Sequence, residues 1–130
     1  MATGLAMLTQ PPGEAGERAS LTGSIVDYID ENYASGISLR DVAQAFSYSP
    51  CHLTYAFRRN TGIPVTAWII KRRIAAACEL LAASDLDVAT VCERVGFKDV
   101  CHFTRQFVRH AGTTPGRFRN AMKAARSPHR

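Results

Sequence analysis

Two groups of side chains suited to chemistry occur fifty residues apart in this sequence. Cys51-His52 is followed by Thr54, and Cys101-His102 is followed by Thr104. Thiolates and imidazoles are zinc ligands, so each Cys-His pair raises the question of a metal site. Neighbouring residues on a helix point about 100° apart, however, and such a pair therefore seldom chelates one ion. We expect no metal and no other cofactor.

The same groups admit two further interpretations. A histidine beside a thiol can lower the thiol pKa, so Cys51 and Cys101 are candidate redox sensors, and the alternative is that they are inert small residues. Catalysis has little support, because the sequence contains no Ser/His/Asp set, paired carboxylates, P-loop or G-x-G-x-x-G motif. We expect a binding protein and not an enzyme.

The charge distribution favours a polyanionic partner. The chain has 130 residues and a net charge of +5. Residues 1–50 hold two basic and six acidic side chains, whereas residues 51–130 hold fourteen basic and five acidic ones. A basic half of this size favours nucleic acid as the partner, and the alternative is a merely solvated basic surface.

The composition is that of a globular domain, with 46% hydrophobic and 21% charged residues. No apolar run approaches the roughly 20 residues of a membrane span. The first residues carry no basic stretch before an apolar one, as a secretory signal would. The four cysteines form no CxxC pair. These features predict reduced thiols and a cytoplasmic protein.

The elements that must position the reactive groups have helical periodicity almost throughout, without strand alternation. We expect a flexible tail or the stub of a linker at residues 1–20, a folded helical domain at residues 21–125, and a frayed end at residues 126–130. Capping residues, prolines and glycines divide the domain into helices. The helices are expected at about 22–33, 38–46, 50–61, 64–83, 87–95, 99–110 and from 115 onward.

Part of this pattern is repeated. CHLTxxF at residues 51–57 matches CHFTxxF at residues 101–107, and Gly62 matches Gly112. Each repeat, at about 38–61 and 87–111, predicts a short helix, a tight turn and a longer helix, which is the helix-turn-helix plan. The alternative is a helical scaffold without a ligand. Two units joined by a helix of about 30 Å favour DNA, since one DNA turn is about 34 Å. The core is expected to contain Leu53, Phe57, Trp68, Phe97, Phe107 and Phe118.

Residues 38–81 and 88–118 resemble the DNA-binding domain of the AraC/XylS family of bacterial transcription regulators. The second stretch is the more specific: Gly96-Phe97, Phe103 and Phe107 precede G-x-T-P-x-x-F-R at residues 112–119. The resemblance covers roughly residues 22–120. It implies an all-α fold of seven helices, in which a long helix joins two helix-turn-helix subdomains. It also implies that the third and sixth helices enter adjacent major-groove segments, and that the protein regulates promoters, more often as an activator.

Two residues depart from the family pattern. Tyr55 stands where the family often has arginine, and tyrosine cannot make the bidentate contact to guanine that arginine makes. The first unit is therefore expected to read sequence more weakly than the second, which keeps Arg105 at the matching position. Ser47 replaces the usual turn glycine of the first unit.

The predicted base contacts are the exposed residues near the start of each recognition helix. Arg105 is the strongest candidate, because a guanidinium can donate to O6 and N7 of guanine. His52 is alternatively a phosphate contact. The full set is Cys51, His52, Thr54, Tyr55, Val100, Cys101, His102, Thr104 and Arg105.

The predicted phosphate contacts fix the register of the protein on DNA without reading sequence. Basic side chains dominate this group, and two helix N-terminal residues complete it through their amides. The set is Ser38, Arg58, Arg59, Lys71, Arg72, Arg109, Thr114 and Arg117.

The predicted function is sequence-specific binding to double-stranded promoter DNA and regulation of transcription. The closest alternative is a nonspecific architectural DNA-binding protein. The resemblance adds RNA polymerase as a further partner. It also raises the possibility of an N-terminal effector and dimerisation domain outside this sequence.

Overall fold

A computed structural model describes residues 14–126, and these form seven α-helices and one short 3₁₀ helix, with no strand among them. The all-α, seven-helix prediction is confirmed. The elements are α2 (Glu14–Asn32), η1 (Tyr33–Ser35), α3 (Leu39–Ala45), α4 (Pro50–Thr61), α5 (Val65–Ala83), α6 (Val88–Arg94), α7 (Val100–Ala111) and α8 (Pro115–Arg126).

The first helix is longer than the sequence predicted. It begins at Glu14, so residues 14–20 are helical where a flexible tail was expected. The sequence pattern missed this part because residues 1–20 have no periodic apolar face. The remainder of the predicted tail and residues 127–130 of the predicted frayed end lie outside the described residues.

The internal helix boundaries follow the capping residues closely. The Ser38 side chain accepts a hydrogen bond from the Asp41 amide while the Asp41 carboxylate accepts one from the Ser38 amide, which is a complete capping box. At the other end of the repeat, Gly62 and Gly112 adopt left-handed conformations that end α4 and α7.

Two hydrophobic cores share α5. The first subdomain (α2, η1, α3 and α4) closes over one end of that helix, with Val65 and Ile69 in its core. The second subdomain (α6, α7 and α8) closes over the other end, with Ala77 and Leu81 in its core. Tyr33 packs against both cores. Helix α5 is therefore part of the hydrophobic core of each subdomain and is more than a linker between them.

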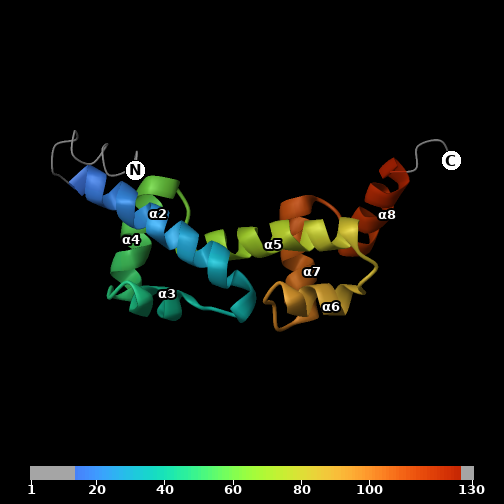
Figure 1. The fold of residues 1–130 in the computed structure, drawn as a ribbon, viewed down its shortest axis with the longest axis horizontal. Coiled ribbons are helices and arrows are strands. Elements are labelled where there is room, and N and C mark those ends of the chain that lie inside the picture. Colours follow the sequence, from blue (N-terminus) through green and yellow to red (C-terminus); the bar gives the residue numbers. More distant parts are fainter. Residues whose placement is uncertain (1–13, 127–130) are drawn as a thin grey trace.

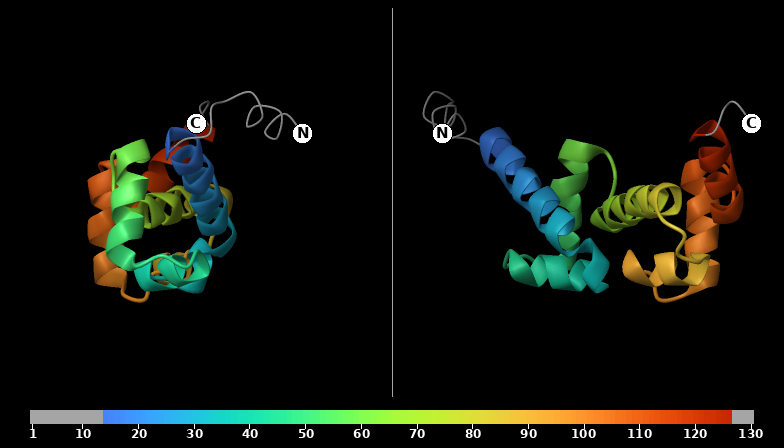
Figure 2. Two further views of the ribbon diagram at one scale, coloured as in Figure 1. Left: turned by 90° about the vertical axis from the view of Figure 1, so that its left-hand side faces the viewer. Right: turned by 45° about the vertical axis from the view of Figure 1, so that its right-hand side comes forward.

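The molecule is elongated along α5, with one subdomain at each end (Figure 1). Viewed along this long axis, α4 and α7 lie one behind the other on the same side, and α2 lies on the opposite side (Figure 2). The fold thus presents the second helix of each repeat on one face.

The predicted core is confirmed for Leu53, Phe57, Phe97 and Phe107, which are all buried. Trp68 and Phe118 are only half-buried. Each lies at the edge of a core and packs its ring edge-on against a buried phenylalanine, Trp68 on Phe57 and Phe118 on Phe107.

Candidate nucleic-acid interface

The two turns have the same backbone path. In the first turn the Tyr48 amide donates to the Ala43 carbonyl at 2.9 Å, and the corresponding bond of the second turn is 3.1 Å long. Ser47 has a φ of +59° and Gly96 a φ of +102°. The left-handed residue makes both turns tight, although only the second has the glycine that this conformation favours.

Each recognition helix begins at a side-chain cap that fixes its first turn. The Ser49 hydroxyl accepts a hydrogen bond from the His52 amide at 3.2 Å. The Asp99 carboxylate accepts from the amides of Cys101 and His102, at 3.2 and 3.3 Å. The first turns of α4 and α7 are consequently set by equivalent caps and offer equivalent positions.

The outer face of α4 carries the predicted base contacts of the first unit. Cys51 and His52 are exposed, Tyr55 is 62% exposed, and Thr54 is half-buried. The Tyr55 hydroxyl accepts a hydrogen bond from the Arg59 guanidinium at 3.0 Å. This contact couples a predicted base-reading side chain to a predicted phosphate contact one helical turn away.

The outer face of α7 carries the corresponding set in the second unit. Val100, Cys101 and Arg105 are exposed, whereas His102 and Thr104 are half-buried. Among residues 20–125, whose side chains the structure describes, no hydrogen bond or ion pair holds the exposed Arg105 guanidinium. Its five donors are therefore available to a ligand.

The two histidines of the repeat are held alike against aromatic rings. The His52 ring meets Tyr48 edge-on with centroids 5.2 Å apart, and the His102 ring meets Phe97 at 5.5 Å. Because the partner ring lies in the turn in each case, the histidine is oriented by the turn before any ligand arrives.

Most of the predicted phosphate contacts are exposed basic residues beside these helices. Arg58 and Arg59 lie in the last turn of α4, and Lys71 lies on α5 over the Trp68 ring. Arg109 and Arg117 are exposed on α7 and α8. A hollow of about 220 Å³ lies between parts of α5 and α7 and is lined by Thr66, Ala67, Ile70, Gln106, Arg109 and His110.

Three of the predicted phosphate contacts are already engaged within the protein. The Arg72 guanidinium pairs with Asp30 at 2.9 Å and lies over the Tyr33 ring at 4.4 Å, so it is directed at α2 and η1 and is a poor candidate for DNA. The hydroxyls of Ser38 and Thr114 accept hydrogen bonds from amides of their own helices. A phosphate contact at these two helix starts would therefore use backbone amides of the first helical turn.

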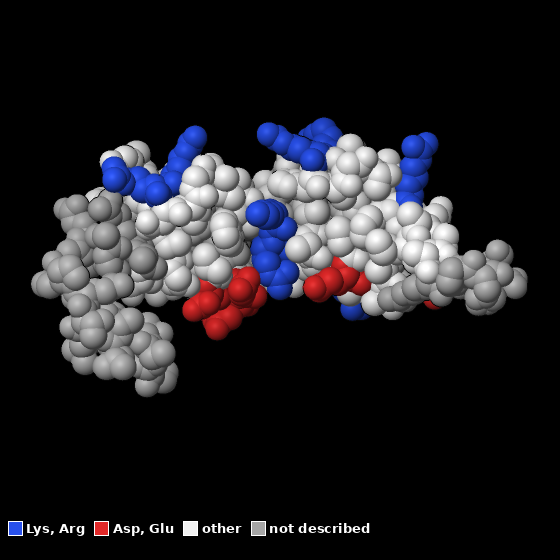
Figure 3. Space-filling model, turned by 90° about the horizontal axis from the view of Figure 1, so that it is seen from above, with Lys and Arg blue, Asp and Glu red and all other residues white. Residues whose placement is uncertain are grey.

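The charges are segregated over the surface. Seen from above, most visible Lys and Arg side chains project along one long edge and the middle of the molecule, and Asp and Glu side chains gather toward the other edge (Figure 3). The acidic residues Asp27, Asp30 and Glu31 belong to α2, whereas α4 and α7 contain no acidic residue. A polyanion is therefore attracted to the side of α4 and α7.

Two arginines that join segments distant in the sequence were missed from the sequence. Arg73 and Arg119 donate to main-chain carbonyls 36 to 40 residues away. Burial lowers the pKa of Arg73. One signal was available: Arg73 lies at four-residue spacing between Ile69 and Ala77, which are both buried, so it occupies an inward position of α5.

A metal site and a redox role were both considered for the cysteines from the sequence, and the structure describes the surroundings of all four thiols. All four thiols are free, and burial raises the pKa of Cys78 and Cys92. Between residues 14 and 126, no group of three or more His, Cys, Asp or Glu side chains is placed to hold a metal ion. No helix in that range is long and apolar enough to cross a membrane.

Two helix-turn-helix units, with their second helices on one basic face, define the class of a double helix-turn-helix DNA-binding domain. A family model described as "Helix-turn-helix domain" matches residues 42–121.

The chain is also similar to individual proteins of known identity, among them the following three. The arabinose operon regulatory protein of Escherichia coli is 38% identical over 93 residues, which are 71% of this chain and 32% of that protein. The HTH-type transcriptional activator AarP of Providencia stuartii is 29% identical, with 78% of this chain and 76% of AarP covered. The DNA-binding domain of AdpA, solved with a target DNA, has a TM-score of 0.75 and 28% identity, covering 82% of this chain and 96% of that one.

The chain belongs to the AraC/XylS family, whose C-terminal DNA-binding domain it matches. It spans about a third of the length of the first curated relatives that it matches.

Proposed function

We propose that α4 and α7 enter successive major-groove segments on one face of duplex DNA, and that the chain thereby regulates transcription from specific promoters. The observation that carries this proposal is the placement of two equivalently capped helices on the same side of the molecule, at the two ends of α5 (Figure 2). The 19 residues of α5 span about 28 Å, close to the 34 Å of one DNA turn.

The two helices have unequal roles in this proposal. Arg105 reads guanine, because its exposed guanidinium can donate to O6 and N7 together. Tyr55 instead presents a ring whose hydroxyl is held by Arg59, and it contacts a thymine methyl or a phosphate. The second unit then supplies most of the sequence discrimination, and the first supplies affinity and register.

Promoter activation, a contact with RNA polymerase and a cytoplasmic location complete the proposal. AarP is named a transcriptional activator, and the chain covers most of AarP. The curated relatives of greater length leave room for an effector and dimerisation domain in the whole protein.

A competition experiment at fixed salt tests this function against nonspecific architectural binding. The affinity for the duplex that selection from random DNA enriches most is measured against the affinity for random duplexes of equal length. Specific recognition predicts a ratio of about a thousandfold or more. A ratio near one, with the usual salt dependence retained, would favour the architectural alternative.

A further inference from the structure

The two subdomains meet at a joint built around Arg73, which we define as Tyr33, Ile37, Arg73, Gly96 and Phe97. Arg73 extends from the middle of α5 toward the first subdomain. Its Nε donates to the Tyr33 carbonyl at 2.9 Å and its Nη2 to the Ile37 carbonyl at 3.1 Å. A single guanidinium therefore fixes the segment that joins α2 to α3.

The second subdomain contacts the same guanidinium. The Arg73 guanidinium lies 5.7 Å from the centre of the Phe97 ring, in the turn of the second helix-turn-helix. At Gly96 in that turn, an added Cβ would lie 2.4 Å from the Tyr33 carbonyl oxygen and 2.9 Å from the Arg73 Nε. The turn that aims α7 therefore rests directly on η1 and on Arg73.

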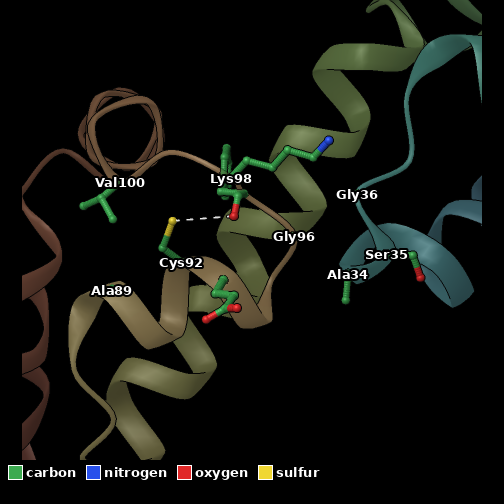
Figure 4. Close-up of a pocket in the computed structure, with 10 residues that line it drawn as sticks. Ala34, Ser35, Gly36, Ala89, Cys92, Gly96, Lys98 and Val100 are labelled. Atoms are coloured by element: carbon green, nitrogen blue, oxygen red, sulfur yellow. Dashed lines mark hydrogen bonds between the residues drawn. The ribbon is translucent and has the colours of Figure 1, made fainter.

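An open pocket of about 480 Å³ borders the joint and is lined from both sides. Ala34, Ser35 and Gly36 come from the first subdomain and face Gly96 and Lys98 of the second (Figure 4). The pocket separates part of the facing surfaces, and beside it the Arg73 hydrogen bonds hold the first subdomain to the middle of α5.

We propose that Arg73 is a positioning residue that sets which spacing between two DNA half-sites the protein accepts. The proposal rests on the proposed function, in which α4 and α7 read neighbouring major-groove segments. One base pair of extra spacing moves a half-site by about 3.4 Å and rotates it by about 35°. A fixed joint cannot follow this change, whereas a loosened joint can.

The first test measures the joint without DNA. Cys51 and Cys101 are exposed thiols on α4 and α7, and Cys92 is buried, so spin labels can be attached at the first two positions after replacing Cys78 with alanine. Pulsed electron resonance then gives the distribution of distances between the recognition helices. The proposal predicts a narrow distribution for the parent chain and a clearly broader one for Arg73→Ala.

The second test uses duplexes that carry both half-sites at the preferred spacing and at one base pair more or less. Arg73→Ala is expected to reduce the roughly tenfold preference for the correct spacing to threefold or less, while its affinity for a single half-site stays unchanged. Arg73→Lys keeps the charge but replaces the Nε and Nη2 of the planar guanidinium, which reach two separate carbonyls, with a single nitrogen on a shorter side chain, so it should behave like Arg73→Ala. Arg94→Ala is the matched control, because Arg94 is exposed on α6 and makes no hydrogen bond or ion pair to a joint residue.

Three results would overturn the proposal. They are an unchanged distance distribution in folded Arg73→Ala, an equal loss of affinity at every spacing, and parent-like spacing preference in Arg73→Lys. If Arg73→Ala does not fold, Arg73→Lys decides the question by both measurements. Failure of the parent chain to prefer any sequence would instead count against the proposed function, and the distance measurement would still decide the role of Arg73.

Discussion

Ser47 and Gly96 occupy the same position in the two turns, and both have positive φ angles, +59° and +102°. Their surroundings differ. Ser47 is exposed, whereas Gly96 is buried with the Tyr33 carbonyl oxygen where a Cβ would have to be. The left-handed conformation is therefore strained at Ser47, whereas at Gly96 it comes with close packing against the Tyr33 carbonyl.

Replacing Ser47 with glycine and Gly96 with alanine should change the free energy of unfolding in opposite directions. Ser47→Gly should raise the free energy of unfolding by about 0.5 kcal/mol, because relief of left-handed strain exceeds the added entropy of the unfolded chain. Gly96→Ala should lower it by about 2 kcal/mol or more, because Cβ and the carbonyl cannot both be accommodated. Urea unfolding of both variants measures the difference, and equal effects at the two positions would refute the comparison.

Arg105 is expected to discriminate at a single base. Arg105→Ala should lose about 1–3 kcal/mol of preference for guanine at one position of the site while other positions keep their preferences. Lys71→Ala, an exposed lysine on α5, should weaken all duplexes alike and reduce the salt dependence of binding. Binding to a panel of single-base variants checks both, and a uniform loss for Arg105→Ala would remove it from the base contacts.

Tyr55 offers a gain-of-function test of the first unit. Tyr55→Arg places a guanidinium at the position that matches Arg105, so a preference for guanine should appear at the equivalent position of the first half-site, again about 1–3 kcal/mol. Tyr55→Phe is the control, since it removes only the hydroxyl that Arg59 contacts. If Tyr55→Arg binds with an unaltered base preference, α4 does not approach the bases as proposed.

Arg119 should stabilise the second subdomain through a hydrogen bond to a residue that is distant in the sequence. Its Nε donates to the Leu81 carbonyl at 3.0 Å and so joins α8 to the C-terminal turn of α5. Arg119→Ala is expected to lower the free energy of unfolding by about 1–3 kcal/mol, because a half-buried charged hydrogen bond is lost. Arg117→Ala, which removes an exposed arginine of the same helix, should leave thermal stability within about 0.5 kcal/mol of the parent. Similar melting curves for the two variants would contradict this role.

The repeated units were predictable because their signals are local. Ser38 with Asp41, Ser49 with Pro50, and Asp99 each start a helix through contacts within three residues. The buried faces of α4 and α7 follow from helical spacing alone.

The joint and the orientation of Arg72 were not predictable in this way. Lys71, Arg72 and Arg73 form one basic run in the sequence, but successive residues of a helix point about 100° apart. Lys71 therefore lies over Trp68, and Arg72 lies against Asp30 and Tyr33. Arg73 points into the joint. These partners are up to 42 residues away along the chain, and only the folded arrangement brings them together.

Selection of duplexes from random DNA tests the central claim most directly. Two recognition helices on one face, joined by α5, predict enrichment of a motif with two boxes about one helical turn apart, the second box containing the guanine read by Arg105. Failure to enrich any sequence, under conditions in which the folded chain binds DNA, would contradict sequence-specific recognition by α4 and α7.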